Sequence, residues 1–267
     1  MSERWVLVTG GALRLGREFC LAFARAGWNV ICHYRHSADA AQQTCAELRA
    51  LGRQAHALQA DLAHTDAAAR LFDDVLATIG RTPDALVNNA SQFEPDSDPD
   101  THLTPELLTG LLQLNLAVPL QLAGLLASAR AARGQGGDAC AIHVLDQKVF
   151  NLNPDYFSYT VTKLALERAV ALQAQALAPR VRVVGLAPGL MYLSGPQTPE
   201  NFAGASQLNL LARPIDPVRV AQAGVFLASN DAITGTTLSV DNGQHLVPLA
   251  CDVMFLPPPP PTAGEAP

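Results

Sequence analysis

Three side chains in the second half of the chain are suited to proton transfer. Tyr159 and Lys163 stand four positions apart, a spacing that places both side chains on one face of a helix. Asp146 precedes them, and an ionised carboxylate only accepts hydrogen bonds. It would repel a carbonyl oxygen, but it would suit ring N–H groups or a ring nitrogen that must gain a proton. We therefore expect a nitrogen heterocycle rather than a simple ketone as substrate. The alternative is that Asp146 only caps a helix or lies in a loop.

The composition is typical of a globular protein with one large core. The chain has 267 residues, 49% of them hydrophobic. The formal net charge is −6, and no basic stripe suggests a nucleic-acid partner. The five cysteines are scattered without C-x-x-C spacing, which favours reduced thiols over disulfides or a metal site. The sequence shows no signal peptide and no apolar run of membrane-spanning length, so we expect a cytoplasmic protein with no membrane partner.

Short apolar runs alternate with helical patterns along most of the sequence. Expected strands cover residues 5–8, 28–34, 54–60, 85–88, 140–145, 181–186 and 237–240. Expected helices cover residues 14–26, 38–50, 66–79, 105–133, 156–177 and 217–228, the fourth of them bent near Pro119. This alternation predicts an α/β, doubly wound, Rossmann-type fold, in which helices cover both faces of a seven-stranded parallel sheet.

We expect one Rossmann-type domain over residues 1–256. Within it, residues 189–211 are loop-rich and follow the sixth expected strand, at the edge of the sheet where ligands bind. They form either a lid over the substrate or a plain surface loop. Residues 253–256 are an apolar run suited to packing on a neighbouring subunit. Residues 257–267 are rich in proline and predict an extended or disordered tail.

A glycine-rich turn between the first expected strand and helix suits a nucleotide. Gly10 and Gly16 allow a tight turn that brings a pyrophosphate to the helix N-terminus. The second expected strand ends without the acidic residue that NAD-binding folds usually place there. Cationic and hydroxyl groups take its place, among them the guanidinium of Arg35. Arg14, in the glycine-rich turn, adds a second guanidinium, and such a set suits a 2′-phosphate. The residues at the strand end are His33, Tyr34, Arg35, His36 and Ser37. NADPH is therefore the expected cofactor, and a solvated surface patch is the alternative.

With these residues, the chain resembles the short-chain dehydrogenase/reductase family over about residues 4–246. The other matching motifs are Asp61–Leu62, Asn88-Asn89-Ala90, Asn115 and Pro188–Gly189. Within that family the chain is most similar to pteridine reductases and bacterial dihydropterin (dihydromonapterin) reductases. Arg14 stands where most members have glycine, and Asp146 replaces the usual serine. Phe93 matches the phenylalanine that stacks on the pterin ring in pteridine reductases.

The resemblance implies a role for each motif. The catalytic set would be Asp146, Tyr159, Lys163 and Asn115. Tyr159 would be the acid, with its pKa lowered by the nearby positive charges of Lys163 and the oxidised nicotinamide ring, and Asn115 would order a water. Substrate contacts would come from Ser91, Phe93, Asp146, Tyr156 and Tyr159, although Phe93 and Tyr156 are equally suited to simple packing. Beyond the strand-end group above, the cofactor contacts would be Gly10, Arg14, Leu15, Gly16, Asp61, Leu62, Asn89, Ala90, Ser91, Tyr159, Lys163, Pro188, Gly189 and Leu190. The family also implies a homotetramer without a metal.

Three functions fit these residues. The main interpretation is an NADPH-dependent reductase of a pterin or dihydropterin, in which hydride goes to a ring C=N bond and Tyr159 with Asp146 supplies the proton. The second is a ketone or 3-oxoacyl-thioester reductase of the same family, in which Asp146 is a chance substitution. The third is an NADPH-binding regulatory protein with little turnover, and the intact Tyr159, Lys163 and Asn115 argue against it.

Overall fold

Seven parallel strands form one sheet in the computed structural model, which describes residues 3–96, 103–135, 139–195 and 197–256. The strands are β1 (Trp5–Val8), β2 (Asn29–Tyr34), β3 (Ala55–Gln59), β4 (Ala85–Asn88), β5 (Ala139–Val144), β6 (Val181–Pro188) and β7 (Thr237–Val240). Their order is β3-β2-β1-β4-β5-β6-β7, and every neighbouring pair is parallel. The sheet grows outward in opposite directions from β1 and β4, and open α/β sheets bind ligands at such a switch point.

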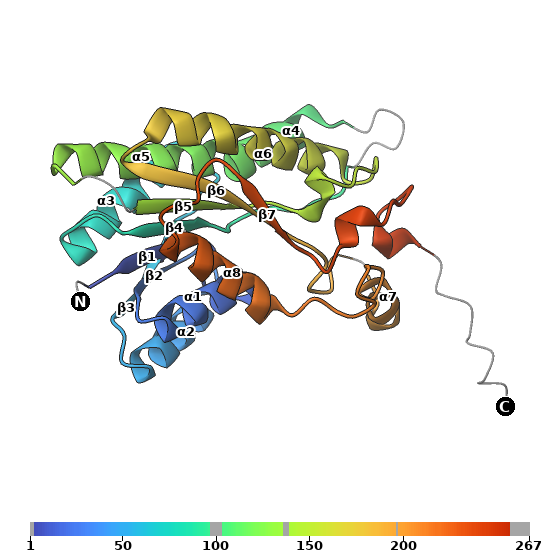
Figure 1. Cartoon of the computed structure of the whole chain (residues 1–267), viewed down its shortest axis with the longest axis horizontal. Coiled ribbons are helices and arrows are strands. Elements are labelled where there is room, and N and C mark those ends of the chain that lie inside the picture. The colour runs from blue at the N-terminus through green and yellow to red at the C-terminus, as the bar shows by residue number, and fades with distance from the viewer. Residues whose placement is uncertain (1–2, 97–102, 136–138, 196, 257–267) are drawn as a thin grey trace.

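Helices cover both faces of this sheet (Figure 1). They are α1 (Arg14–Arg25), α2 (Ala38–Ala50), α3 (Ala67–Ile79), α4 (Pro105–Leu112), α5 (Val118–Ala132), α6 (Phe157–Leu177), α7 (Pro199–Ala205) and α8 (Pro217–Ser229). Helices α1, α2 and α8 pack on one face, whereas α3, α5 and α6 pack on the other. The predicted doubly wound α/β fold is confirmed.

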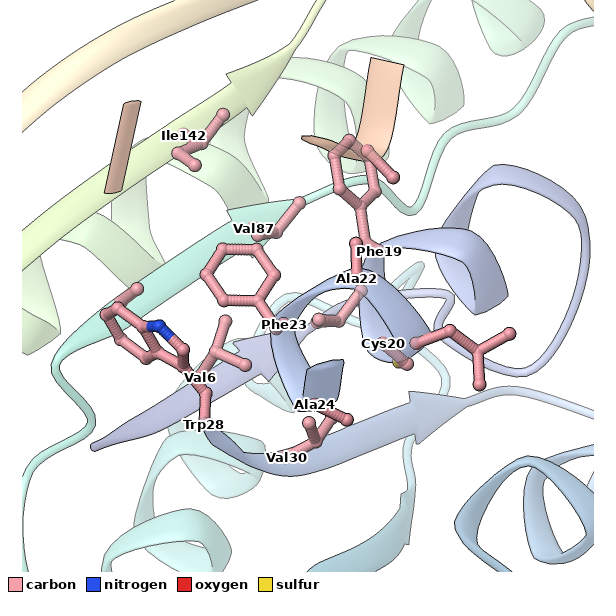
Figure 2. Close-up of a cluster of buried hydrophobic side chains, with 14 of the residues drawn as sticks. Val6, Phe19, Cys20, Ala22, Phe23, Ala24, Trp28, Val30, Val87 and Ile142 are labelled. Carbon is pink, nitrogen blue, oxygen red and sulfur yellow. The ribbon is translucent and has the colours of Figure 1, made fainter. Parts of the chain in front are cut away.

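The core beneath α1 is built around two aromatic rings of that helix. Phe19 and Phe23 are one turn apart and fully buried, so both rings point at the sheet. Figure 2 shows them in one cluster with Val6, Val87 and Ile142, which come from three adjacent strands. This packing fixes the position of α1, and with it the glycine-rich turn that leads into the helix.

On the opposite face, α5 packs Leu122 and Leu126 into the core, where both side chains are fully buried. The stretch Pro105–Ala132 is long and apolar enough to cross a membrane by length and composition alone. The expectation that no stretch reaches that length is therefore wrong. The buried face of α5 accounts for the apolar composition, because a helix that packs on a sheet needs such a face.

The long helix expected over residues 105–133 is interrupted by a wider turn. Helix α4 ends at Leu112, a π-helical turn (η1) covers Gln113–Ala117, and α5 begins at Val118. Pro119 has no N–H, and in a regular α-helix its ring would clash with the carbonyl four residues earlier, that of Asn115. The π turn, with Asn115 at its centre, widens the helix at that carbonyl. The distortion thus lies one turn ahead of the bend that we expected near Pro119.

A chain of buried hydrogen bonds joins β4, β5 and α6. The fully buried ring of His143 has Nδ1 at 3.0 Å from Asn88 Nδ2 and Nε2 at 2.9 Å from Gln173 Oε1. Asn88 also donates to the carbonyl of Pro119, and Gln173 donates to the carbonyl of Leu120. Burial lowers the pKa of His143 to about 4. The ring is therefore neutral, accepting from Asn88 and donating to Gln173.

This neutral histidine should make the fold sensitive to acid. A histidine in the unfolded chain has a pKa of about 6.5, so the unfolded state gains a proton before the folded state does. The free energy of unfolding should therefore fall as the pH drops from about 6.5 towards 4. His143→Gln keeps hydrogen-bonding groups without titrating, and we expect it to lose about 2 kcal/mol less than wild type between pH values of about 7 and 4.5.

Urea unfolding across this pH range measures the difference. His64→Gln at an exposed position is the matched control and should behave as wild type. Identical acid slopes for wild type and His143→Gln would show that His143 does not control the acid sensitivity.

The segment after β6 is more regular than expected. Residues 189–211 include α7, whose N-terminus is capped by Thr198: its hydroxyl accepts the N–H of Asn201 at 3.2 Å. The expectation of a loop-rich stretch did not include the helix over Pro199–Ala205. The tail predicted over residues 257–267 lies outside the described residues.

Candidate active site

Two cavities that share Ser91 lie at the carboxyl ends of the strands. The first has a volume of about 430 Å³, and its lining includes these expected site residues: Arg14, Leu15, Asn89, Ser91, Phe93, Asp146, Tyr159, Lys163, Pro188, Gly189 and Leu190. The second has a volume of about 360 Å³, and its lining includes Gly10, His33, Arg35, Asp61, Leu62, Ala90 and Ser91. The fold thus gathers residues that are far apart in the sequence into two neighbouring sites, each large enough for a small molecule.

The three residues proposed for proton transfer meet at the first cavity. Tyr159 Oη donates to Asp146 Oδ2 at 3.0 Å. The other carboxylate oxygen of Asp146 accepts the backbone N–H of Lys148 at 2.9 Å. Lys163 Nζ donates to the carbonyl of Val144 at 2.9 Å and lies 5.6 Å from the centre of the Tyr159 ring. The phenol therefore contacts the carboxylate directly, while the ammonium lies beside the ring.

Burial and the Asp146 carboxylate control the proton affinities of this group. Burial, the charge of Asp146 and the hydrogen bond to it raise the pKa of Tyr159 well above its ordinary value. Lys163, which together with an oxidised nicotinamide ring is expected to favour the phenolate, does not by itself outweigh burial and Asp146. Burial lowers the pKa of Lys163 to about 8 and raises the pKa of Asp146. Tyr159 is therefore protonated at neutral pH and has a proton to donate.

Phe93 presents its ring to the first cavity from the loop after β4. It stacks on Tyr156 with ring centroids 4.0 Å apart and planes inclined by 23°, and it meets the Tyr159 ring edge-on at 4.7 Å. Phe93 lines the cavity, whereas Tyr156 lies behind it and is absent from the lining formed by the described residues. Phe93 is thus placed to contact a ligand, and Tyr156 supports it.

Asn115 holds the loop that carries Ser91 and Phe93. Its Oδ1 accepts the Ser91 hydroxyl at 3.1 Å and the Gln92 N–H at 2.9 Å, and its Nδ2 donates to the Gln92 carbonyl at 3.0 Å and to the Thr162 hydroxyl at 3.2 Å. These four bonds use the full capacity of the side-chain amide. Its side chain therefore positions the loop and has no hydrogen-bonding atom left for the water that the resemblance implied.

The glycine-rich turn, the expected phosphate cradle, is packed so closely on the protein's own backbone that side chains would not fit at Gly10 and Gly16. Gly10 has a φ of 63°, and a Cβ on Gly16 would lie 1.9 Å from the Gly10 carbonyl oxygen. His33 Nδ1 accepts the Gly10 N–H at 3.0 Å, and His33 Nε2 donates to the Ala60 carbonyl at 3.1 Å. Burial lowers the pKa of His33 to about 4. His33 therefore braces the turn as a neutral ring, which corrects its expected contribution of positive charge to a phosphate site.

The surroundings of this cradle fit a dinucleotide. The N-cap of α1, Leu13, makes no side-chain capping bond, and N–H groups at a helix N-terminus attract phosphate. Arg35 lines the second cavity and is half-exposed, with Nε 3.0 Å from Asp61 Oδ2. Its guanidinium is the charge that a 2′-phosphate would meet. Three other expected cofactor residues at the end of β2 are absent from the described lining of both cavities: Tyr34, His36 and Ser37.

Arg14 belongs to the first cavity rather than to the 2′-phosphate patch that we expected. Its Nη2 donates to the Leu193 carbonyl at 2.9 Å, and its guanidinium lies 4.9 Å from the centre of the Tyr192 ring. The backbone of Arg14 has a φ of 50°, in the left-handed region where residues other than glycine are strained. That conformation explains why a glycine suits this position and why an arginine here incurs a cost in stability.

A pair of substitutions separates the backbone strain at Arg14 from the contacts of its side chain. Arg14→Gly and Arg14→Ala both remove the guanidinium, but only glycine adopts a positive φ without strain. We expect Arg14→Gly to be more stable than Arg14→Ala by about 1 kcal/mol. Urea unfolding of the two variants measures the difference, and Arg14→Ala being equally or more stable would contradict the assigned strain.

The first cavity also has lining residues that the sequence analysis did not identify. They are Val144, Leu145, Gln147, Lys148, Met191, Tyr192, Ser194, Gly195, Gln244, Asp252, Val253 and Met254. Four of them, Met191, Tyr192, Ser194 and Gly195, lie in the loop-rich stretch 189–211 that was expected at the ligand-binding edge without being named singly. Lys148 is two positions after Asp146, and that proximity in the sequence could have indicated that Lys148 lies at the same cavity. Val253 and Met254 belong to the apolar run expected to pack on a neighbouring subunit, and they line the cavity of their own chain.

Comparison with known proteins places this site in a family. A family model described as Enoyl-(Acyl carrier protein) reductase matches residues 11–245. The chain belongs to the short-chain dehydrogenase/reductase family. The expected resemblance is confirmed, and the matched region contains Gly16 of the glycine-rich turn, Asp146, Tyr159 and Lys163.

Relatives within the family include both pterin-type and ketone reductases. The structure of FolM alternative dihydrofolate reductase 1 from Brucella canis, complexed with NADP, has a TM-score of 0.84 and 34% identity, covering 91% of this chain and 94% of its own. Dihydromonapterin reductase of Escherichia coli is 28% identical, over 90% of this chain and 96% of its own. The angucycline C-6 ketoreductase LanV with bound NADP has a TM-score of 0.81 and 27% identity, covering 91% of this chain and 96% of its own.

Proposed function

We propose that this oxidoreductase is an NADPH-dependent reductase of a pterin or dihydropterin. The observation that carries the proposal is the hydrogen bond from Tyr159 to Asp146 at the wall of the first cavity. A carboxylate at this point repels a substrate carbonyl oxygen and attracts ring N–H and amino groups, which a pterin supplies. The similarity to FolM of Brucella canis and to the dihydromonapterin reductase of Escherichia coli supports the same substrate class.

NADPH is the cofactor that the residues fit. Gly10 and Gly16 pack the turn closely at the N-terminus of α1, where a pyrophosphate would bind, and Arg35 supplies a guanidinium at the end of β2, where NAD-binding folds place an acid. The NADP complexes of the FolM and LanV structures agree with this choice. When bound, the cofactor supplies hydride. Asn89 clamps the turn, because its Nδ2 donates to the carbonyls of Thr9 and Gly10.

The chain's own residues then control the proton and the orientation of the substrate. Burial and Asp146 raise the pKa of Tyr159, and the phenol would donate its proton to the ring nitrogen as hydride arrives at the adjacent carbon. Asp146 would accept from the ring N–H or amino groups and so fix the plane of the ring. Phe93 would stack on that plane, a contact worth about 0.5–1.5 kcal/mol beyond simple burial. Lys163, held by the Val144 carbonyl, would keep positive charge beside the phenol.

Substitutions at Asp146 and Tyr159 test the substrate assignment. With a dihydropterin, we expect Asp146→Ser and Asp146→Asn to lower kcat/KM on the order of 10²-fold, because neither provides a carboxylate beside the acid. Tyr159→Phe removes the acid itself and should be the least active. NADPH oxidation is followed with a panel of dihydropterins, dihydrofolate and simple ketones. Asp73→Asn, on the exposed face of α3, is the matched control and should retain full activity.

The outcomes of this panel separate the candidate functions. Turnover of dihydropterins that depends on Asp146 supports the proposal. Turnover of ketones alone contradicts it and favours the ketone reductase that the similarity to LanV suggests. Full pterin activity in Asp146→Ser contradicts the role assigned to Asp146. NADPH binding without turnover of any compound favours a regulatory role. A cytoplasmic location and a homotetramer remain part of the proposal, and light scattering of the purified protein tests the tetramer.

The cofactor preference depends on Arg35. NADPH should bind at least about tenfold more tightly than NADH, a difference of about 1.4 kcal/mol. Arg35→Asp would place a second carboxylate beside Asp61, and its repulsion of a 2′-phosphate should abolish or reverse the preference, whereas Arg35→Lys should retain most of it. Nicotinamide fluorescence titrations give both dissociation constants for each protein. Equal affinity of wild type for the two cofactors would reject this role of Arg35.

A further inference from the structure

The segment after β7 turns back onto the first cavity. Asp252 is followed by a single 3₁₀ turn, η4 (Val253–Phe255), and Asp252, Val253 and Met254 all line the cavity that contains Asp146 and Tyr159. Figure 1 shows this turn beside α7 at one end of the sheet. The family model ends at residue 245, so the match to the family does not account for this part of the wall.

Polar contacts from three different parts of the chain hold the segment in place. Lys148 Nζ forms an ion pair with Asp252 Oδ2 at 3.0 Å. The backbone N–H of Asp252 donates to Asp155 Oδ2 at 2.6 Å, and Asn201 Nδ2, from α7, donates to the Met254 carbonyl at 3.2 Å. The segment is therefore bound specifically, through side chains as well as backbone groups.

Asp252 fixes both the shape and the position of the turn. Its Oδ1 accepts the N–H of Met254 at 3.2 Å, which caps η4, while its Oδ2 accepts from Lys148. The Lys148 side chain is buried and also donates to Asn153 Oδ1 at 2.8 Å. Because the backbone N–H of Lys148 donates to Asp146, a single residue connects the proton-transfer group to the segment that closes the cavity.

Met254 continues the row of side chains behind the stacking ring. Tyr156 Oη donates to Met254 Sδ at 3.0 Å, and Tyr156 stacks on Phe93. Met254, Tyr156, Phe93 and Tyr159 belong to one apolar cluster. Displacing Met254 would therefore remove one wall of the cavity and the support of the ring expected to face the substrate.

We propose that the segment 252–254 is part of the substrate site, with Met254 as a substrate contact and the Lys148–Asp252 ion pair as the positioning element that holds it there. The chemical class of the ligand, a flat nitrogen heterocycle, rests on the proposed function. The position of residues 252–254 in the cavity wall does not depend on the proposed function, since it applies to any substrate that reaches Tyr159.

Three variants test the positioning role: Asp252→Asn, Lys148→Met and the charge-swapped double variant Lys148→Asp/Asp252→Lys. Hydrogen exchange of the peptide that contains residues 252–255 should become faster in the two single variants. Their KM for the substrate should rise about tenfold or more, while the NADPH dissociation constant stays within about twofold of wild type. The double variant should recover part of the loss, because it restores an ion pair of opposite orientation. Glu200→Gln, on the exposed surface of α7, is the control and should match wild type in both measurements.

Substitutions of Met254 test the wall itself and leave the ion pair intact. Met254→Ala should raise KM about tenfold with kcat less affected, and Met254→Leu, which conserves volume, should stay close to wild type. If Lys148→Met fails to fold, the Met254 variants still decide whether the segment 252–254 contacts the substrate. Unchanged KM in both Met254→Ala and Asp252→Asn would overturn the proposal, as would faster exchange without any change in KM.

The assays use whichever substrate wild type reduces in the panel above. If wild type reduces ketones and not pterins, the proposed function fails, and the same KM comparison with the ketone still decides whether residues 252–254 belong to the site. If wild type reduces neither, the affinity of the NADPH complex for a pterin, measured by its fluorescence quenching, replaces KM. An affinity that is the same for wild type and Met254→Ala would then overturn the proposal.

Discussion

The hydrogen bond between Tyr159 and Asp146 requires that β5 and α6 meet in one fixed register, and much of the structure maintains that register. Asp146 follows β5, and Tyr159 lies in the first turn of α6. Further along the same two elements, His143 and Gln173 are hydrogen-bonded inside the core. This second contact fixes the helix against the strand at a distance from the solvent, so the carboxylate and the phenol are preorganised. Preorganisation of this kind is what proton transfer to a bound substrate needs.

The cofactor end is held by a separate set of contacts. Phe19 and Phe23 anchor α1 on the sheet, and the neutral ring of His33 supports the glycine-rich turn from below. The loop after β4 then joins the two halves of the site. Asn89 clamps the turn on one side, while Asn115 orders Ser91 and Gln92 on the other. Asn89 bonds backbone carbonyls, and Asn115 bonds both backbone groups of Gln92 and two hydroxyls, so two short side chains control the geometry of a large site.

Hydrophobic periodicity was sufficient to predict the seven strands, most helices and the two-faced sheet, because burial on a parallel sheet imposes an unambiguous pattern. The motifs predicted Asp146, Tyr159, Lys163 and Phe93 as neighbours of one cavity, and the structure brings all four together. The protonation states of the site residues, by contrast, could not be predicted from residue type. His33 looks cationic in the sequence, but burial keeps it neutral, and burial together with the Asp146 carboxylate raises the pKa of Tyr159. These effects depend on distances that no local pattern contains.

Contacts between residues far apart in the chain could not be predicted from the sequence either. Arg14 reaches the loop after β6, and residues 252–254 fold back onto the cavity, although neither contact leaves a periodic signature. The second of these contacts has a consequence for biosynthesis. Residues 252–254 are made only after all seven strands have left the ribosome's active centre, whereas the glycine-rich turn is made at the start. A growing chain can therefore assemble its nucleotide cradle well before its substrate cavity has a complete wall.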